Sequence, residues 1–480
     1  MRKASIFVII LVSITLGAAS LTRGHEWGDD FASYIMQAES IMDGNTREFV
    51  EHNTFTIFES SNQIGPVAYP WGYPLILTPV YFLKGISPLA LKLPGLFFYA
   101  GFLICLYFLL RSRLSQAESL LCLALFAFNP LLIQFLDQIL SDIPFLFFST
   151  FALWLISKDK QNINHFALTG ATIFFAFFIR TPGILLLASF IIFKFFGAWR
   201  NRANRFAFQK SARNMLVTCG TFGLLWILST LLFPQGGEGY LIQYQNFTLR
   251  TALGFIYGYF QAFSLFFGGS LIWQIVYYFV FILFLAGAWI KRKDEPFFLI
   301  FFALWAFLLI TWPFWQGPRF IFPLLPLFIY FAFEGMKFIL GKFPESYTKI
   351  GRSIFYGFWL VIIGVFLFNS AVNAYGNLRN HRAINGPFDP YSQEVYKYIK
   401  EKTPSESIVV FFKPRVMRLM TDHDTLMSTE CDRILKGNYL VLSRKVGKNQ
   451  QIPPEEIDAC HLPLNEVLKN SKFIIYEIQN

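Results

Sequence analysis

Long apolar runs alternate with short polar loops along the first three quarters of the chain. Eleven of these runs approach the ~20 residues that an α-helix needs to cross a bilayer. They cover residues 6–19, 91–110, 118–134, 138–156, 165–179, 182–197, 213–233, 270–290, 297–313, 320–340 and 353–372. The pattern therefore predicts a mainly α, polytopic membrane helical bundle with about eleven transmembrane helices.

Basic residues are concentrated in every second loop of this predicted bundle. The basic loops are residues 111–116, 157–164, 199–213, 291–295 and 341–352. The connections with few cations are residues 134–138, 180–181, 234–269 and 312–319. The positive-inside rule places the basic loops and the N-terminus in the cytoplasm. Because the number of spans is odd, the region after the last span is expected outside.

The first span has two interpretations. Met1, Arg2 and Lys3 precede a short apolar run that ends in small residues at 17–20, which is also the pattern of a cleavable signal peptide. We favour a retained first helix, because polytopic proteins commonly keep theirs. The orientation of the chain is the same in both cases.

Two polar regions lie outside this bundle. The first is a large external loop, residues 22–90, within a transmembrane catalytic domain expected at residues 1–373. The second is a small α/β domain expected at residues 374–480, periplasmic or extracellular. Its predicted elements are a helix at Pro390–Lys402, a strand at 407–412, a short helix after Pro414, a strand at Tyr439–Ser443 and a hairpin of 464–470 with 472–479.

Composition supports the membrane assignment and excludes one class of function. The chain is 55% hydrophobic and 15% charged, whereas about a quarter of the residues of a soluble domain are charged. The net charge is +11, but the excess cations lie in loops between spans, where they act as topology signals. Nucleic acid is therefore not expected as a partner; membrane lipids are.

Five cysteines are too few for a disulfide framework. Cys105, Cys122 and Cys219 fall in apolar spans and are interpreted as packing residues. Cys431 and Cys460 both fall in the outside domain, where oxidation can occur. Either a disulfide between them or two free thiols fits the sequence.

Asp29 and Asp30 form the candidate catalytic centre, directly after the first span and before a helix-like run at 31–42. One interpretation is that they only stabilise a helix N-terminus through its macrodipole. The other is that one carboxylate is a general base at the membrane surface, with its pKa raised by burial and by its neighbour.

Arg180 and Arg319 lie at predicted outer ends of helices, against the usual bias of cations. They either snorkel to lipid head groups or bind a phosphate at the outer leaflet, for which guanidinium geometry is suited. Asp142 either starts its helix, joins the acidic cluster or holds a cation. The set suggests displacement of a phosphate leaving group by an activated hydroxyl. The sequence contains no nucleotide-binding loop.

Six short motifs follow one another in a characteristic order. They are Asp29-Asp30 with Tyr34, the proline-aromatic segment 69–77 that contains Tyr69 and Tyr73, Asn129-Pro130, residues 141–144, residues 180–183 and residues 319–326. In order and spacing they resemble the GT-C class of polytopic glycosyltransferases. The likeness is to the branch that contains bacterial relatives of protein O-mannosyltransferases and of the lipid A aminoarabinose transferase, and it covers most of the chain.

The resemblance implies an inverting transfer of a hexosyl or pentosyl group from a polyprenyl-phosphate donor to a hydroxyl of a lipid, glycan or protein acceptor. It implies a multi-pass protein of the bacterial cytoplasmic membrane with its active site on the outer face. Asp29 is then the base, supported by Asp30. Arg319 contacts the donor phosphate, as does Arg180. The other implied substrate-binding residues are Tyr34, Tyr69, Tyr73 and Asp142.

This chain departs from the family where some relatives have a lysine before the proline-aromatic segment, since it has Ala68-Tyr69 there. No donor contact is carried over from that lysine. Some GT-C enzymes use a divalent metal ion and others do not, and the sequence leaves this cofactor open. Acceptor specificity is expected in loops 48–68 and 234–269 and in the outside domain.

A transporter or flippase of a lipid-linked saccharide is the alternative function. Such proteins place charged or broken-helix sites near the bilayer midplane, often in internal repeats. Here the ionisable residues lie near predicted helix ends, and the sequence shows no repeat. A scaffold protein, the third alternative, would leave the acidic pair and the outer arginines without a role.

Overall fold

A computed structural model describes residues 2–62, 65–158, 162–200, 205–236 and 247–479. Parts of two predicted basic loops, residues 159–161 and 201–204, lie outside the described residues. So do parts of the two loops expected to select the acceptor, residues 63–64 and 237–246.

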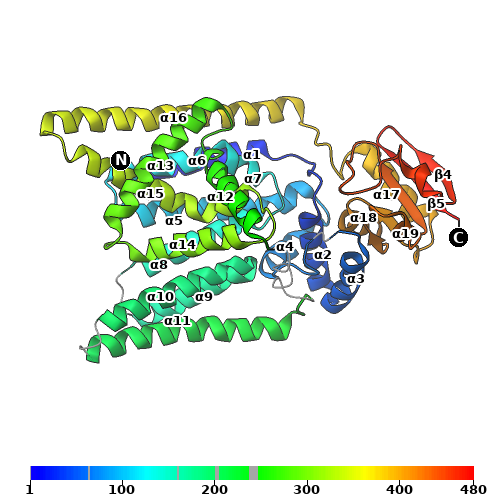
Figure 1. The fold of residues 1–480 in the computed structure, drawn as a ribbon, viewed down its shortest axis with the longest axis horizontal. Helices are drawn as coiled ribbons and strands as arrows, with labels where there is room; N and C mark the ends of the chain where they lie inside the picture. Colours follow the sequence, from blue (N-terminus) through cyan, green and yellow to red (C-terminus); the bar gives the residue numbers. More distant parts are fainter. Residues whose placement is uncertain (1, 63–64, 159–161, 201–204, 237–246, 480) are drawn as a thin grey trace.

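Apolar helices lie side by side in one bundle (Figure 1). Two 3-10 helices, η1 (Thr181–Gly183) and η3 (Pro318–Leu324), lead into α10 and α15. The α-helices of the bundle are α1 (Arg2–Ser20), α5 (Pro88–Arg111), α6 (Gln116–Ala127), α7 (Pro130–Leu136), α8 (Asp142–Ile156), α9 (Ile163–Ile179), α10 (Ile184–Arg200), α11 (Arg205–Leu232), α13 (Leu271–Lys291), α14 (Pro296–Thr311), α15 (Leu325–Leu340) and α16 (Glu345–Asn380). The polytopic helical fold expected from the hydropathy pattern is confirmed.

Among the described residues, six helices are long and apolar enough to cross a membrane, and the bent pair α6 and α7 makes a seventh span. Four shorter apolar helices, α1, α8, α9 and α14, cover the other four predicted runs but fall below this length. The bend of 50° between α6 and α7 falls at Asn129-Pro130. Pro130 cannot donate a backbone hydrogen bond to the preceding turn, and the Asn129 side chain instead accepts from Leu132 N at 3.2 Å and starts a new helix.

The bundle is centred on α15, which is buried along most of its length. Its closest neighbour is α13, and the two cross at Gly287 and Gly335. A Cβ on Gly287 would lie 1.8 Å from Phe331 O, and one on Gly335 would lie 2.0 Å from Leu283 O. Only glycine permits this backbone approach, which is typical of helix packing in membranes.

Four further helices lie in the polar connections. They are α2 (Asp29–Asp43), α3 (Thr46–Glu59), α4 (Gly72–Lys84) and α12 (Leu249–Ser264). The large first loop therefore contains three helices, whereas the sequence indicated only the run at 31–42. In Figure 1, α2, α3 and α4 lie between the bundle and the C-terminal domain.

The C-terminal domain is a five-stranded mixed sheet with the order β2-β1-β3-β5-β4. Its strands are β1 (Val409–Phe411), β2 (Thr425–Leu426), β3 (Tyr439–Ser443), β4 (Leu464–Lys469) and β5 (Phe473–Ile478), and its helices are α17 (Pro390–Lys402), α18 (Pro414–Thr421), α19 (Cys431–Ile434) and the 3-10 helix η4 (Ile457–Cys460). β1 pairs in parallel with β2 and β3, and β5 pairs antiparallel with β3 and β4. The predicted α/β character is confirmed, and β2 was missed because two residues carry no periodicity.

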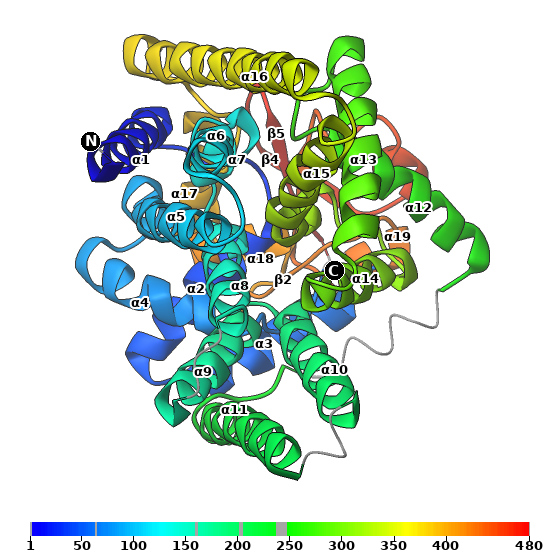
Figure 2. The same ribbon diagram turned by 90° about the vertical axis from the view of Figure 1, so that its left-hand side faces the viewer.

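The C-terminal domain lies beyond one end of the bundle, opposite the end at which the chain begins (Figure 1). Seen along the bundle, α16 and α11 lie on opposite outer sides of it, with the sheet behind (Figure 2). Helix α16 continues to Asn380, seven residues past the boundary expected at 373. It therefore extends beyond the apolar run toward the C-terminal domain.

Cys431 and Cys460 form a disulfide that joins α19 to η4 and closes a sequence separation of 29 residues. Replacing both cysteines with serine should lower the free energy of unfolding of the C-terminal domain by about 3 kcal/mol, because the open chain gains conformational entropy when it unfolds. Thermal unfolding in detergent measures this change. Cys219→Ser, which removes a free cysteine of the bundle, is the matched control and should leave the transition unchanged; an equal effect of both variants would contradict the assignment.

Candidate active site

The loop that leads to Asp29 is held in place by hydrogen bonds from residues inside the bundle. Lys92, fully buried near the start of α5, donates to the carbonyls of Thr22 (3.0 Å) and Gly24 (2.6 Å) and pairs with Asp137 at 2.6 Å. His25 accepts a hydrogen bond from Ile139 N through Nε2 at 3.0 Å. Breaking a buried pair leaves an uncompensated charge, which costs several kcal/mol. The position of α2 relative to the bundle is therefore fixed before Asp29 is reached.

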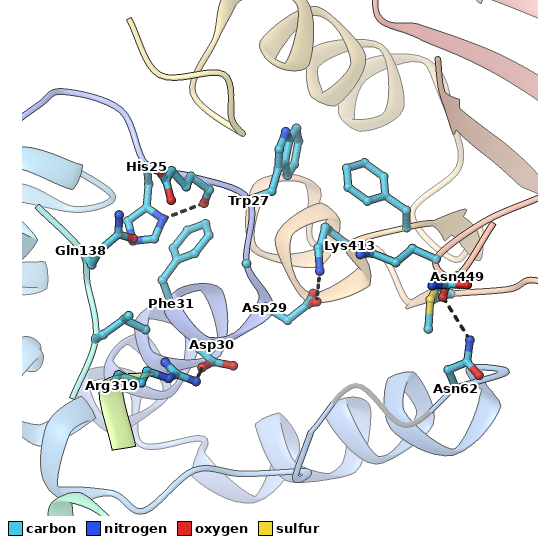
Figure 3. Close-up of a pocket in the computed structure, with 16 residues that line it drawn as sticks. His25, Trp27, Asp29, Asp30, Phe31, Asn62, Gln138, Arg319, Lys413 and Asn449 are labelled. Atoms are coloured by element: carbon cyan, nitrogen blue, oxygen red, sulfur yellow. Dashed lines mark hydrogen bonds and ion pairs between the residues drawn. The ribbon is translucent and has the colours of Figure 1, made fainter. Parts of the chain in front are cut away.

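Asp29 is the first residue of α2 and is buried. Its Oδ2 lies 3.2 Å from Lys413 Nζ, which comes from the segment between β1 and α18 of the C-terminal domain. Its Oδ1 has no hydrogen-bond partner among the described residues. Figure 3 shows the two side chains facing each other across the boundary between the domains. One oxygen of Asp29 is thus held while the other is left to accept a proton.

Asp30 has a different set of partners. Its Oδ2 accepts from Arg319 Nη2 at 2.8 Å, and its Oδ1 accepts from the Tyr69 hydroxyl at 2.5 Å. Charge-assisted hydrogen bonds of this length are among the strong ones. Both oxygens of Asp30 are therefore occupied, which suits a carboxylate that remains ionised.

The two neighbouring carboxyl groups have pKa values shifted in opposite directions. Burial raises the pKa of Asp29, against the opposing effect of the Lys413 ammonium. Burial also disfavours the charge of Asp30, but Arg319 and the Tyr69 hydroxyl outweigh it and hold the pKa of Asp30 below its ordinary value. Divergence of this kind separates a proton acceptor from a permanent anion in acid–base sites.

Asp142 holds the two predicted arginines together. As the first residue of α8 it forms an ion pair with Arg180, and its Oδ2 lies 3.6 Å from Arg319 Nη1. Arg180 is the C-cap of α9, and its guanidinium stacks over the ring of Phe320 at 4.3 Å. The chain Asp30–Arg319–Asp142–Arg180 links four segments that lie far apart in the sequence.

The three predicted tyrosines differ in their placement. Tyr69 touches Asp30, and the Tyr34 hydroxyl lies 3.0 Å from Ser141 Oγ beside the start of α8. Tyr73 packs edge-on against Tyr34 at 4.9 Å and is not among the described residues that line either cavity below. Tyr73 therefore lies behind the site, where it packs against Tyr34.

Two cavities meet at the pair of Asp30 and Arg319, since both residues line both cavities. The first, of about 470 Å³, contains Asp29 and lies between the bundle and the C-terminal domain (Figure 3). The second, of about 670 Å³, contains Arg180 and is otherwise walled largely by apolar side chains of α10, α14 and the segment before η3. Asp29 thus shares a cavity with Arg319 but not with Arg180.

The carboxylates do not fit a divalent-metal site. Asp29 already faces Lys413, Asp30 faces Arg319, and Asp142 faces two arginines. Mg²⁺ and Ca²⁺ take six or more oxygen ligands, several of which can be water or substrate oxygens, but the protein's share is supplied mainly by carboxylates. Within the described part of the chain, no three His, Cys, Asp or Glu side chains come close enough to share a metal ion.

The sequence analysis did not identify Lys413 or the ion pair between Lys92 and Asp137. Lys413 is one of many cations in a short domain of ordinary composition, and its only local signal is the following Pro414, which marks a helix start. Lys92 and Asp137 lie at the ends of predicted spans, where charged residues are common. Their partners are distant in sequence, so spacing could not have found them.

Comparison with solved structures identifies similar folds. ArnT from Cupriavidus metallidurans, bound to undecaprenyl phosphate, has a TM-score of 0.60 at 13% identity, covering 98% of this chain and 97% of that chain. The oligosaccharyltransferase of Archaeoglobus fulgidus, in complex with Zn and sulfate, has a TM-score of 0.61 at 12% identity, covering 99% and 73%. The arabinofuranosyltransferase AftD from mycobacteria has a TM-score of 0.50 at 12% identity, covering 99% and 41%.

No family model and no curated protein matches the chain. The structural likenesses show that the chain has the fold of the GT-C glycosyltransferases, which confirms the resemblance predicted from the motifs.

Replacing Asp142 with asparagine should lower the free energy of unfolding by about 3 kcal/mol, because two partly buried guanidinium groups lose a shared carboxylate. The melting temperature of the detergent-solubilised protein reports the loss. Asp294→Asn, which removes an exposed partner of Lys291, is the control and should have little effect. If both variants melt at the same temperature as the wild type, the Asp142 network does not stabilise the fold.

Proposed function

We propose that this protein is a membrane glycosyltransferase that moves a sugar from a polyprenyl-phosphate donor to a hydroxyl acceptor, with Asp29 as general base. The proposal is carried by one observation: two cavities of different character meet at the pair of Asp30 and Arg319. A transferase of this kind needs such a meeting point between a lipid-linked donor and a polar acceptor.

The larger cavity suits the donor. Its charged lining residues, among those described, are Arg180, Arg319 and Asp30, so that cations exceed anions by one. Leu308, Trp312 and other apolar side chains form most of its remaining wall, which matches a polyprenyl chain. Guanidinium groups bind phosphate through paired hydrogen bonds. Among proteins of this fold, ArnT is solved with undecaprenyl phosphate and the archaeal oligosaccharyltransferase with a dolichol-phosphate, which supports the same class of donor here.

The smaller cavity suits the acceptor. It contains Asp29, and its wall includes the side chains of Asn62, Gln138 and Gln450. Carboxamides donate and accept hydrogen bonds together, as recognition of hydroxyl groups requires. An acceptor hydroxyl in this cavity would lie beside Asp29, whose Oδ1 has no hydrogen-bond partner among the described residues.

The proposed step is a displacement with inversion. The acceptor oxygen forms a bond to the anomeric carbon while its proton passes to Asp29, and the bond from that carbon to the donor phosphate oxygen breaks. The phosphate leaves with the electron pair, and Arg319 and Arg180 stabilise the charge that develops on it. Asp30 stays ionised and orients Arg319 and the hydroxyl of Tyr69.

We place the active site on the outer face of a bacterial cytoplasmic membrane, with the N-terminus in the cytoplasm and the C-terminal domain periplasmic or extracellular. The distribution of basic loops supports this orientation. So does the disulfide, because such bonds persist outside the reducing cytoplasm.

The transporter alternative has less support. Asp29 and Asp142 each begin a helix, Arg180 caps one, and Arg319 lies in the 3-10 helix before α15. Transport sites instead lie in helices broken near the middle of the membrane. A carboxylate with one occupied and one free oxygen is also more useful to proton transfer than to passage of a saccharide.

Replacing Asp29 with asparagine should lower kcat by about a hundred-fold to ten-thousand-fold, because the amide cannot take the proton of the acceptor. Transfer of radiolabelled sugar from a defined polyprenyl-phosphate donor measures the rate. The folded state and donor binding should be retained. Asp43→Asn, at the exposed end of the same helix, is the matched control with wild-type turnover; wild-type turnover in the Asp29 variant would refute the proposed base.

Replacing Arg319 with glutamine should raise the KM for the donor by roughly ten-fold to a hundred-fold, as expected for loss of a charge-assisted hydrogen bond of about 1.5–3 kcal/mol. Arg319→Lys should restore only part of the affinity for the donor, because an ammonium lacks the planar, two-pronged hydrogen-bond geometry of a guanidinium. The control is Arg379→Gln at the exposed end of α16. A donor KM that is unchanged in Arg319→Gln would contradict the proposed phosphate site.

A further inference from the structure

We infer that Lys413 is a positioning residue for Asp29, supplied by the C-terminal domain, so that the active site is complete only while that domain is docked. The inference rests on the proposed function, since it assigns a task within the same site. It gives the C-terminal domain a direct part in catalysis rather than only in acceptor selection.

The geometry of the pair is the first argument. Lys413 Nζ lies 3.2 Å from Asp29 Oδ2, and the two side chains are 19% and 6% exposed. An ion pair shielded from water to this degree interacts more strongly than one at the surface. The same contact leaves Asp29 Oδ1 without a partner among the described residues. Lys413 therefore holds one oxygen of Asp29 and leaves the other, within the described part of the chain, without a hydrogen bond in a buried position.

The backbone around Lys413 holds its side chain in place. Lys413 is the N-cap of α18, directly before Pro414 and two residues after the end of β1. The α conformation is disfavoured before proline, and Lys413 lies outside it with φ of −128° and ψ of 74°. Helix α18 packs against α2, so the start of one helix is brought to the start of the other. The lysine reaches Asp29 from a rigid element.

A second contact ties the domain to the other side of Asp29. Trp27, two residues before Asp29, packs its ring edge-on against Phe412 at 5.0 Å, Phe411 at 6.0 Å and Phe473 at 6.2 Å. Such aromatic pairs contribute beyond the burial of their surface. The chain before Asp29 and the cation facing Asp29 are thus both held by the β1–α18 region (Figure 3). Undocking the domain would release both together.

The electrostatic task of Lys413 follows from the groups around Asp29. Lys413 and Arg415 face it from the C-terminal domain and favour its ionised form, while Asp30 on its own helix and burial disfavour that form. Arg319 lines the same cavity from the bundle and is already paired with Asp30. Removing the Lys413 charge would raise the pKa of Asp29 further and leave less of the base ionised at neutral pH.

A purely structural role makes a different prediction. Lys436, just after α19, also forms an ion pair from the C-terminal domain to the first loop, with Glu59 at the end of α3 at 2.6 Å. The Lys436 side chain is 50% exposed, and neither residue lines either cavity. If Lys413 only helped to dock the domain, loss of either lysine would act in the same way. The Lys436 variant is therefore the matched control.

The test compares the full-length wild type with Lys413→Met, Lys413→Arg and Lys436→Met in sugar transfer from a polyprenyl-phosphate donor over a range of pH. Because the base acts ionised, the rate rises with pH through the pKa of Asp29. In Lys413→Met this rise should move to higher pH by about one pH unit or more. At pH values below the pKa of Asp29, the rate of Lys413→Met should be roughly ten-fold lower than that of the wild type. Lys413→Arg should restore the wild-type profile, and Lys436→Met should keep it.

A readout without turnover separates this inference from the proposed function. A hydrophobic carbodiimide modifies protonated carboxyl groups, and mass spectrometry of the Asp29 peptide gives the pH at which labelling is half complete. That pH should rise in Lys413→Met and stay at the wild-type value in Lys436→Met. Limited proteolysis of the C-terminal domain checks in each variant that the domain is folded and docked.

The outcomes are distinct. A wild-type rate profile and wild-type labelling in a docked Lys413→Met overturn the inference, even if Asp29→Asn is inactive. A lower rate in both lysine variants without any change in pH dependence also overturns it and leaves Lys413 a docking residue. If Asp29→Asn keeps its turnover while labelling still shifts, the proposed base fails but the assigned ion pair stands.

Discussion

Ion pairing between carboxylates and guanidinium groups is the constraint on which the arrangement of this site depends. Asp30 pairs with Arg319, Arg319 with Asp142, and Asp142 with Arg180. Charged groups removed from water must find opposite charges at close range, because the penalty for an unpaired buried charge is several kcal/mol. The network therefore fixes α2, which lies outside the bundle, against the starts of α8 and η3 and the end of α9.

The same constraint separates the two acidic neighbours. Asp29 and Asp30 are adjacent in sequence, but successive residues of a helix point in different directions. One reaches the C-terminal domain and Lys413, and the other reaches the bundle and Arg319. This difference in surroundings divides the pair into a carboxylate with a free oxygen and one with both oxygens bonded. The division of roles that we propose for the two carboxylates thus follows from their place at a boundary between domains.

Much of the fold could be predicted from periodicity. The eleven apolar runs correspond to helices because a bilayer permits few other structures, and the predicted helix Pro390–Lys402 and hairpin around residue 470 match α17 and the pair of β4 and β5. The prediction was weakest where the pattern was short or amphipathic, as in α3, β2 and α12. In the site, Asp30, Asp142, Arg180 and Arg319 were predicted as one group and are brought together. Lys413 was not predicted, and Tyr73 lies behind the site rather than in a cavity.

The sequence by itself determined the order of the apolar helices, the separate C-terminal α/β domain and the residue types available for chemistry. These properties follow from local hydrophobicity and from motifs of a few residues. The tertiary structure decided which cation faces which carboxylate, and hence which of Asp29 and Asp30 keeps a free oxygen. Lys413 lies 384 residues from Asp29 along the chain. No local pattern encodes such a pair, because its energy exists only when the packed domains exclude water from both charges.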